Sequence, residues 1–408
     1  MSERLRERPG DTGARSIDYG LFDADNHYYE PRDCFTRYIE PGLREKAIHT
    51  RIDADGVERV YVGDRRFTFL EHRNFDTAVP PGALRKMLRA IKSGSADIRG
   101  TDVEEPMQPE YVDRSARLAT MDRQGIEAAF LFPTLAVCVE AFMMRDHEQL
   151  YGNLRAFNRW LDEAWGFAHE GRIYAPPLLS LADVDLAVQE LDRVLAQGAR
   201  IVSLRPGPAY GRSPADPHFD PFWARVNEAH VTVGFHIGES SYNELMSVHW
   251  GEEPNPPSHR QSALQWTCFY GDRPIMDTIA ALIYHNLFGR FPNVRVMSVE
   301  NGSLWVDYLL AAMDKMNRMG RNGPWPGGVL TERPSDIFRR HVFVSPYHEE
   351  PIEQLIERIG ASQVLFGSDW PHAEGLAEPR QFADALMHLD ERGLRQVMRE
   401  NARSLVAV

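Results

Sequence analysis

The stretch Val364-Leu-Phe-Gly-Ser-Asp-Trp-Pro-His372 decides the fold that we predict for this chain. Its apolar run ends at Gly367-Ser-Asp369, and Trp370-Pro371 then enforces a turn. This pattern is typical of a buried strand that presents a carboxylate at its C-terminal end, where the active site of an α/β barrel lies. Alternatively, Asp369 caps the helix that follows. Polar residues at matching strand ends earlier in the chain favour the first interpretation.

The composition is that of a globular protein, because 43% of the 408 residues are hydrophobic and 26% are charged. The formal net charge is −13 and no long basic run occurs, so we expect no nucleic-acid partner. Cys34, Cys138 and Cys268 lie far apart, which predicts neither a disulfide framework nor a cysteine zinc site. No long apolar run or apolar N-terminal segment occurs, so we expect no membrane span, no signal peptide and a cytoplasmic location.

Eight short apolar segments alternate with helical patterns along the chain. The predicted strands are 19–27, 126–132, 174–181, 200–205, 230–236, 293–300, 341–347 and 364–372. The predicted helices are 114–124, 150–169, 182–197, 219–229, 273–288, 303–316, 351–359, 379–389 and 391–406, with Ser303 as the cap of the sixth. This alternation predicts an α/β protein in which eight parallel strands close into a (β/α)8 TIM barrel. We expect a flexible arm over 1–18 and one barrel domain over 19–408.

Two insertions interrupt the predicted barrel, one after strand one and one after strand five. Residues 46–110 mix short strand-like pieces with charged and Pro/Gly-rich segments, which predicts a hairpin and a loop over the site. Residues 239–273 are rich in Trp, His and Pro, and predict a lid that contacts a fairly large, partly apolar substrate. The first insertion places four apolar side chains in a charged region: Phe67, Phe69, Leu70 and Phe75. They need cover from the barrel or from another subunit, so we predict a homodimer or higher homo-oligomer.

Metal-ligating residue types occupy the predicted C-terminal strand ends. Asp25 and His27 belong to strand one, His236 ends strand five, and Asp369 ends strand eight. In a barrel these ends meet on one rim, although a salt-bridged network is the alternative for the Asp-x-His pair. Imidazole and carboxylate ligands suit Zn²⁺, Mn²⁺ or Fe²⁺, and suit neither a thiolate site nor an all-oxygen Ca²⁺ site. We predict one divalent metal, with zinc as the first choice.

Three further polar residues at strand ends are candidates for catalysis or substrate binding. Glu300 ends strand six and either acts as a base or orients water, or else forms a buried salt bridge to Arg205. Arg205 ends strand four and either clamps a substrate carboxylate or forms that same bridge. His372 follows the Pro371 turn and has either a catalytic role or a capping role for the last pair of helices.

Two tyrosines and a third histidine complete the candidates. Tyr28 and Tyr347 stand beside predicted strand ends, where they either line the substrate pocket or pack in the core. His285 lies within a predicted helix, in Ala280-Ala-Leu-Ile-Tyr-His285, so a core position competes with a catalytic one.

Taken in order, these motifs resemble a known family. Asp23-Ala-Asp-Asn-His27, His236 and Gly367-Ser-Asp-Trp-Pro-His372 are similar to the amidohydrolase superfamily, and most of all to its amidohydrolase-2 branch, which includes aminocarboxymuconate semialdehyde decarboxylase. Leu287-Phe-Gly-Arg-Phe-Pro-Asn-Val-Arg295 also resembles this branch, and the similarity covers roughly residues 20–400. The resemblance implies a metal-dependent barrel enzyme that hydrolyses C–N or ester-type bonds, or decarboxylates aromatic and unsaturated acids without a redox cofactor.

Two departures from the family pattern bear on the reaction. The branch usually has His-x-His on strand one, where this chain has Asp25, and this substitution favours a single ion. It usually has a histidine at the end of strand six, where this chain has Glu300 or uses His285 instead. A carboxylate repels a bound carboxylic acid, so we predict hydrolysis of an amide, ester or thioester bond of a small molecule. Decarboxylation is the first alternative, and a barrel that binds metal and ligand without turnover is the second.

Overall fold

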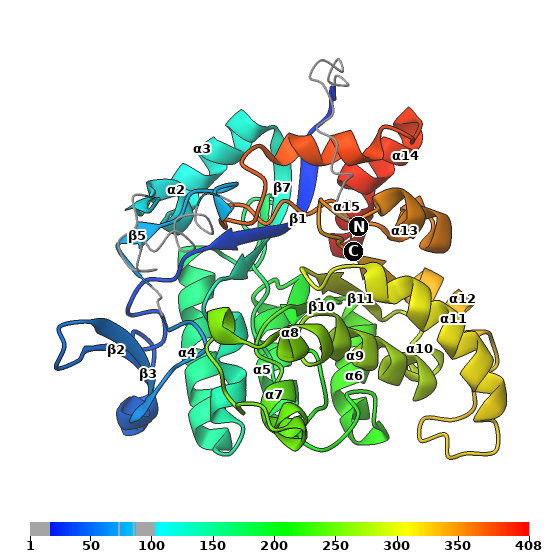
Figure 1. Ribbon diagram of the computed structural model, residues 1–408, viewed down its shortest axis with the longest axis horizontal. Coiled ribbons are helices and arrows are strands. Elements are labelled where there is room, and N and C mark those ends of the chain that lie inside the picture. The colour runs from blue at the N-terminus through cyan, green and yellow to red at the C-terminus, as the bar shows by residue number, and fades with distance from the viewer. Residues whose placement is uncertain (1–16, 72–73, 85, 87–102, 408) are drawn as a thin grey trace.

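Parallel strands lie at the centre of the molecule and helices lie outside them (Figure 1). The computed structural model describes residues 17–71, 74–84, 86 and 103–407, so nearly all of the predicted arm 1–18 lies outside the described residues. One parallel sheet has the order β1 (Leu21–Tyr28), β7 (Ile126–Pro133) and β8 (Ile173–Tyr174). The other has the order β12 (Val342–Val344), β11 (Arg295–Val299), β10 (Thr232–His236) and β9 (Ile201–Ser203).

Short backbone contacts connect the two sheets on both sides. Leu178 forms a parallel bridge to Ser203 of β9, beyond the point where Pro176 and Pro177 end β8 because they lack the N–H that a ladder needs. On the other side, the predicted strand 364–372 lies between β12 and β1. Val364 bridges to Val344, and Trp370 bridges to Asn26. Backbone pairing therefore runs from β1 through both sheets and back to β1.

The 364–372 segment forms single bridges and no continuous strand, for a local reason. Its Asp369 has a φ of 56°, in the left-handed region, which interrupts the extended conformation. Gly367 allows the segment to approach β1 closely, because a Cβ at this position would lie 2.6 Å from the Cβ of Asp25. The stretch that predicted the fold therefore lies directly against β1, which carries the predicted ligands Asp25 and His27.

The helices that cover the strands begin close to the predicted positions, except for α12, which was not predicted. They are α3 (Arg114–Gln124), α4 (His147–Ala164), α5 (Val184–Ala196), α6 (Asp220–Ala229), α9 (Asp272–Tyr284), α11 (Leu304–Met319), α12 (Pro334–His341) and α13 (Ile352–Ile359). Asp113, Asp146 and Asp183 cap α3, α4 and α5 by accepting a hydrogen bond from a first-turn N–H. Ser303 does not cap α11 as predicted, because its hydroxyl donates to Glu350 instead (2.7 Å).

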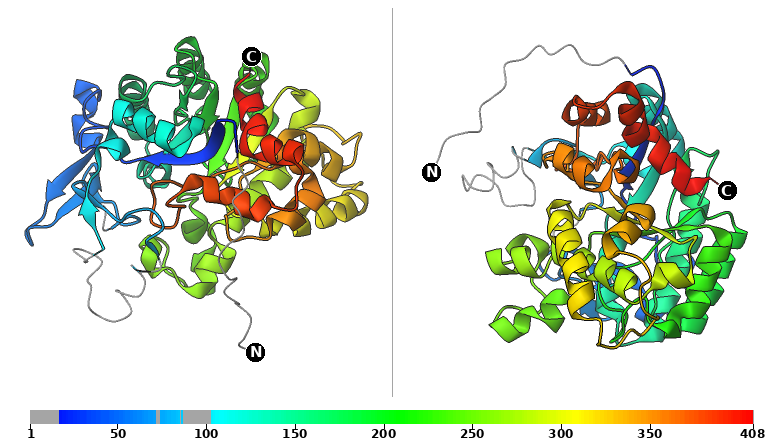
Figure 2. Two further views of the ribbon diagram at one scale, coloured as in Figure 1. Left: turned by 90° about the horizontal axis from the view of Figure 1, so that it is seen from above. Right: turned by 90° about the vertical axis from the view of Figure 1, so that its right-hand side faces the viewer.

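Shorter helices complete the chain, and Figure 2 shows them around the outside of the strands. The C-terminal ones are a 3₁₀ helix over Pro379–Leu386 where an α-helix was predicted, α14 (Glu391–Arg395), a π turn over Gln396–Glu400, and α15 (Asn401–Val406). The others are α2 (Pro109–Val112), α10 (Leu287–Arg290) and 3₁₀ turns at Pro41–Lys46, Ala136–Cys138, Glu140–Met143, Pro217–Phe219 and Ala361–Gln363. No helix in the described ranges is long and apolar enough to cross a membrane.

Residues 46–110 form antiparallel pairs beside the parallel strands. β2 (Ile48–Ile52), β3 (Glu58–Val62) and β4 (Arg65–Arg66) make one small sheet, and β5 (Thr77–Ala78) pairs with β6 (Glu105–Pro106). Phe67 and Phe69 of this region are buried, and their rings contact those of Phe142 and Tyr270 at 4.7 and 5.9 Å. The chain therefore covers these apolar groups by itself.

Residues 239–273 fold into short helical pieces next to the site. They are α7 (Tyr242–Leu245), α8 (Ala263–Cys268), and 3₁₀ turns at Ser247–Trp250 and Ser258–Arg260. α8 begins with a capping box in which Ser262 and Gln265 exchange hydrogen bonds with each other's backbone N–H. A side chain from each of two pieces, Ser258 and Trp266, reaches the cavity described below.

Candidate metal centre

Two histidines and two carboxylates from three strand ends converge at one point. Asp25 and His27 belong to β1, His236 is the last residue of β10, and Glu300 directly follows β11. The Nε2 atom of His27 lies 3.3 Å from Asp25 Oδ1 and 3.6 Å from Glu300 Oε2. The Nε2 atom of His236 lies 3.6 Å from Asp25 Oδ1, 3.3 Å from Glu300 Oε2 and 3.2 Å from His27 Nε2.

These separations fit a shared divalent ion. Donor atoms arranged tetrahedrally around an ion with bonds of about 2.0–2.2 Å are separated by about 3.3–3.6 Å. The donors are only nitrogen and oxygen, which suits Zn²⁺, Mn²⁺ or Fe²⁺. Asp25 Oδ1 is moreover buried and has no hydrogen-bond partner within the described ranges. A cation would satisfy this oxygen, so the residues present fit a metal.

The hydrogen bond at His236 Nδ1 and the low pKa of His27 also suit metal binding. His236 Nδ1 lies 2.8 Å from the main-chain oxygen of Ile237, which can only accept, so Nδ1 carries the proton and Nε2 is free to bind a metal. Burial, together with the neighbouring His372, lowers the pKa of His27 to about 3. His27 is therefore neutral at pH 7, which is the form that binds metals.

Asp369 and His372 form a hydrogen-bonded pair at the edge of this cluster. Asp369 Oδ1 lies 3.5 Å from His27 Nε2 and 2.7 Å from His372 Nδ1. On its other side, His372 Nε2 lies 2.9 Å from Thr134 Oγ1, and Thr134 donates its hydroxyl proton to the main-chain oxygen of Tyr28 (2.9 Å). Thr134 must therefore accept from His372 Nε2–H. Because Nε2 of His372 carries this hydrogen, the contact between Asp369 Oδ1 and His372 Nδ1 needs one further proton. That proton is shared by the carboxylate and the imidazole nitrogen.

Crowding of carboxylates changes their acidity. Burial raises the pKa of Glu300 to about 8, and burial together with the charge of Glu300 raises that of Asp369 well above its usual value. Burial also raises the pKa of Asp25, but the close imidazole groups of His236 and His27 outweigh it and bring that pKa below its ordinary value. The cluster thus holds more negative charge than its histidines balance, which again suits a cation.

The backbone at the two rim carboxylates is strained. Glu300 has a φ of 54° and Asp369 a φ of 56°, and side chains other than glycine seldom adopt this region. Such strain persists only where surrounding contacts impose it, and it is concentrated at functional sites. At Asp369 the contact is a hydrogen bond from its N–H to the main-chain oxygen of Asp25 (2.7 Å).

A buried polar network holds β1 against the Asp369 turn. The Asp23 carboxylate accepts from the N–H and hydroxyl of Ser368 (2.9 and 2.5 Å) and from the Asn26 side chain (2.9 Å). Arg117 of α3 is fully buried and donates to Asn26 Oδ1 (2.5 Å) and to the main-chain oxygen of His27 (2.6 Å). Asp23 therefore shares a face with the ligands, as predicted from alternation, but it positions the turn.

Arg205 pairs with a residue other than the predicted Glu300, and Tyr28 takes the core position that was one of its two predicted alternatives. The two terminal nitrogens of Arg205 donate to the main-chain oxygens of Ser240 and Pro208, and its Nε lies 3.7 Å from Glu140 in an ion pair. Tyr28 is buried against Trp165, with ring centroids 5.2 Å apart, because successive side chains of β1 point to opposite faces and His27 points to the metal centre. Neither residue lines the cavity above that centre.

Tyr347 and His285 are also separate from the ligand cluster. The Tyr347 hydroxyl donates to the main-chain oxygen of Glu300 (2.7 Å), so Tyr347 supports the strained backbone at that residue. His285 lies at the C-terminal end of α9, and its main-chain oxygen accepts from Arg290 (3.1 Å). Of the two candidates for the strand-six position, the structure thus brings Glu300 to the centre.

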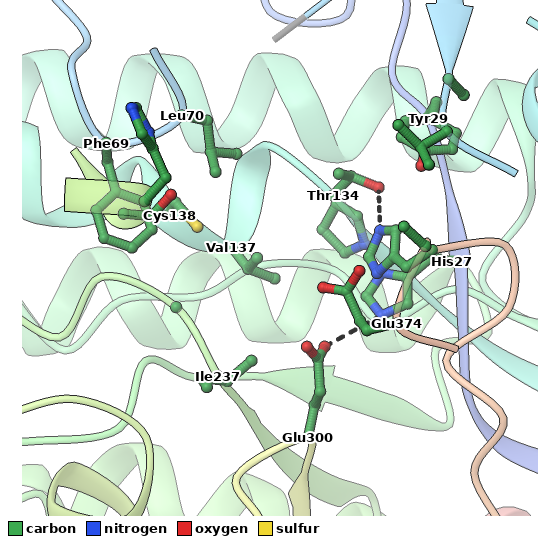
Figure 3. Close-up of a pocket in the computed structure, with 18 of the residues that line it drawn as sticks. His27, Tyr29, Phe69, Leu70, Thr134, Val137, Cys138, Ile237, Glu300 and Glu374 are labelled. Carbon is green, nitrogen blue, oxygen red and sulfur yellow. Dashed lines mark hydrogen bonds and ion pairs between the residues drawn. The ribbon is translucent and has the colours of Figure 1, made fainter. Parts of the chain in front are cut away.

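A cavity of about 420 Å³ opens above the metal centre (Figure 3). His27, His236, Glu300 and His372 form its floor. Its walls come from both predicted insertions and from the loop after β7, and they include Tyr29, Phe69, Leu70, Val79, Val137, Cys138, Ile237, Trp266 and Tyr270. The lining is largely apolar with a few polar groups at one end, as in sites for small molecules.

Sequence reasoning missed Thr134, Arg117 and Glu374. Thr134 follows the Pro133 that ends β7, so its place at a strand end was the signal that could have identified it. Glu374 lies two residues beyond His372 and lines the cavity. Arg117 lies within a helix whose charged residues otherwise suggest a solvated face, and no local signal marks it as buried.

Comparison with known proteins supports the resemblance found in the motifs. A family model described as Amidohydrolase matches residues 23–408. An amidohydrolase from Mycobacterium avium subsp. paratuberculosis K-10 is 37% identical, with a TM-score of 0.84 over 96% of this chain and 100% of that chain. A search of curated proteins finds no match.

Two decarboxylases share the fold at lower identity. 5-Carboxyvanillate decarboxylase from Sphingomonas paucimobilis is 16% identical, with a TM-score of 0.61 over 95% of this chain and 99% of that chain. Dihydroxybenzoic acid decarboxylase from Polaromonas sp. JS666, with bound manganese and the inhibitor 2-nitroresorcinol, is 17% identical, with a TM-score of 0.60 over 95% of this chain and 97% of that chain.

The family model covers almost the whole chain, and it agrees with the motifs from which the family was predicted. Members of this family are metal-dependent hydrolases or decarboxylases. This chain therefore belongs to the amidohydrolase-2 family and is a metal-dependent enzyme.

Proposed function

We propose that this enzyme is a hydrolase on a single (β/α)8 barrel, and that it cleaves an amide, ester or thioester bond of a small organic molecule. The observation that carries the proposal is the Asp369–His372 pair beside a cluster that contains the carboxylate of Glu300. Asp25, His27, His236 and Asp369 would hold one divalent ion, with zinc as first choice, and Glu300 lies at ligand distance as well. When bound, such an ion lowers the pKa of water and polarises a carbonyl group.

The side chains around the ion have separate tasks in this mechanism. Asp369 takes a proton from the attacking water while the oxygen of that water bonds to the substrate carbonyl carbon. Asp369 then gives this proton to the departing amine, alcohol or thiol, and His372, whose Nδ1 lies 2.7 Å from Asp369, holds that carboxyl group in place. Thr134 keeps the His372 ring in place by accepting from Nε2–H. Glu300 orients the water by accepting its second hydrogen.

The carboxylates favour hydrolysis over decarboxylation. Asp25, Glu300 and Asp369 lie within one site, and the substrate of a decarboxylase would add a fourth negative charge. Like charges at such distances repel strongly where water is displaced. Decarboxylation remains the second candidate, because 5-carboxyvanillate decarboxylase and dihydroxybenzoic acid decarboxylase share the fold.

Labelled water tests the proposed reaction. Metal-loaded enzyme in ¹⁸O-water should place one labelled oxygen in the acid product of an ester or amide panel, as measured by mass spectrometry. The Asp369→Asn variant is the control for spontaneous hydrolysis. Unlabelled product together with evolved CO₂ from an aromatic carboxylic acid would instead establish the decarboxylase alternative.

We also propose a homodimer or higher homo-oligomer. Of the apolar groups that first suggested it, Phe67 and Phe69 are buried within the chain and Leu70 and Phe75 are half-buried. Other large apolar side chains are exposed, among them Trp250 and Met319, each 71% exposed. Light scattering at micromolar concentration tests this proposal, and a strictly monomeric mass would refute it.

A further inference from the structure

The cavity above the metal centre has acidic groups in its lining but, within the described ranges, no lysine or arginine. Its carboxylates are Glu71, Glu104, Glu300 and Glu374. Glu71 forms an ion pair with Arg66 (2.7 Å), and Glu104 accepts from the Thr77 hydroxyl (2.6 Å). Glu300 belongs to the ligand cluster. The remaining carboxylate, Glu374, has no hydrogen bond or ion pair in the described part of the chain.

A fixed backbone turn carries Glu374 beside the reacting groups, and the Glu374 side chain itself is exposed. The turn that carries it is closed by hydrogen bonds from Gly375 N–H to the His372 oxygen (3.1 Å) and from Leu376 N–H to the Ser368 oxygen (2.9 Å). Gly375 allows this tight turn, because a Cβ there would clash with the main-chain oxygen of Asp369. In Figure 3 the Glu374 carboxylate faces the cavity near Glu300. Its charge is felt at both Glu300 and Asp369.

The opposite side of the cavity is aromatic. Phe69, Trp266 and Tyr270 contribute to its wall, and the rings of Trp266 and Tyr270 are in edge contact with centroids 4.9 Å apart. Aromatic faces attract cations as well as apolar groups. A ligand that displaces water from this cavity strengthens every charge interaction within it, so an anion is disfavoured and a cation is favoured.

Resting on the proposed hydrolase function, we infer that the preferred substrate carries a positively charged nitrogen, an ammonium or guanidinium group, that pairs with Glu374. Its apolar part lies against the aromatic wall, and its scissile carbonyl group lies at the floor of the cavity. Glu374 thus determines specificity and takes no part in the bond-breaking step. The same pairing excludes carboxylate substrates.

Three esters of similar size test this inference on the metal-loaded enzyme. They are the p-nitrophenyl ester of 6-aminohexanoic acid, which is cationic at pH 7, that of heptanoic acid, which is neutral, and the mono-p-nitrophenyl ester of adipic acid, which is anionic. We expect kcat/KM to fall in that order. Glu374→Gln should lower kcat/KM for the cationic ester by about 5–30-fold, raise it for the anionic ester, and change it less than about 2-fold for the neutral ester.

Glu378→Gln is the matched control, because Glu378 is an exposed glutamate on the same segment that does not line the cavity. It should leave the order of the three esters unchanged. If the esters are hydrolysed and Glu374→Gln leaves the ratio of cationic to anionic kcat/KM unchanged, the inference is wrong while the hydrolase function stands.

A binding measurement separates the inference from the proposed reaction. Isothermal titration calorimetry with hexylamine and hexanoate needs no turnover. Tighter binding of hexylamine by about 5-fold or more, lost in Glu374→Gln, supports the cationic site even if no ester is hydrolysed. Equal or tighter binding of hexanoate overturns it.

Discussion

At the scale of single residues, the direction of each side chain decides its role. His27 and Tyr28 are neighbours on β1, yet one reaches the metal centre and the other packs against Trp165. Glu300 was predicted to act on water near the metal, and its Oε2 lies 3.3 Å from His236 Nε2, within the ligand cluster itself. The type of a residue thus indicates which chemistry its side chain can perform, and the direction of the side chain decides whether it reaches the site.

His236→Ala should remove most of the bound metal and the activity together. The imidazole Nε2 faces the other donors and its tautomer is held by Ile237, so no neighbouring group can replace it. Metal content per chain, measured by elemental analysis after dialysis, checks this expectation. His285→Ala, which removes a histidine outside the centre, should keep its metal. Full metal content in His236→Ala would refute the ligand assignment.

Asp369→Asn should abolish turnover, by about 10³-fold or more, while the metal stays bound. The amide can still contribute an oxygen to the centre but cannot take the proton of the attacking water. Glu300→Gln should slow turnover strongly, by about 10–100-fold, because the water loses a charged hydrogen-bond acceptor. Steady-state kinetics and elemental analysis on the same samples separate the two effects. Near-normal turnover by Asp369→Asn would contradict the assigned role.

At the scale of secondary-structure elements, buried polar contacts connect segments that are far apart in sequence. Asp23 on β1 binds Ser368 of the distant turn, and Arg117 of α3 binds the backbone of β1. These contacts set the separation between Asp25 and Asp369. The strand ends therefore meet at ligand distance because a second set of residues holds them there.

Arg117→Leu should lower the free energy of unfolding by about 3 kcal/mol, because Asn26 and the His27 carbonyl group lose a buried donor. Urea unfolding measures this change. The control is Arg123→Leu on the same helix, whose side chain is 65% exposed and whose removal should cost about 0.5 kcal/mol or less. Equal effects of the two variants would show that the buried network does not stabilise the fold.

At the scale of the whole molecule, burial of a carboxyl group makes stability depend on pH. Burial raises the pKa of Glu239, beyond the end of β10, from 4.5 to about 7. Between these two values the folded chain keeps a proton that the unfolded chain releases. The contribution of protonated Glu239 to the free energy of unfolding is therefore fully present below about pH 4.5, and it is lost as the pH rises toward 7.

Glu239→Gln should therefore be more stable than the parent at pH 8, by about 2 kcal/mol, and nearly equal to it at pH 5. Thermal unfolding of both proteins at the two pH values checks this difference. Glu244→Gln, which removes a glutamate whose side chain is 35% exposed, should show no comparable gain at pH 8. A gain for Glu239→Gln that is equal at both pH values would contradict the burial argument.

The sequence by itself determined the alternation of strands and helices, the family, and the types of residue that meet at the strand ends. These follow from local patterns: apolar runs with a period of two, punctuation by glycine and proline, and Asp, His and Glu at strand ends. Asp25, His27 and His236 lie together, and Asp369 lies at the edge of their cluster, 3.5 Å from His27. Local patterns are sufficient to find these residues because the alternation of side chains along a strand, and the residue at which the strand ends, depend mainly on the strand's own sequence.

Only the tertiary structure decided which charged groups meet. Arg205 pairs with Glu140 and not with Glu300, Ser303 binds Glu350, and Thr134 holds His372 across 238 residues of sequence. Glu374 is a candidate for substrate specificity because it lines the cavity, and its place in the sequence does not indicate this. Such contacts depend on how elements that are distant in sequence pack against each other, to within a few ångströms. The periodicity of residues along the chain does not predict that packing.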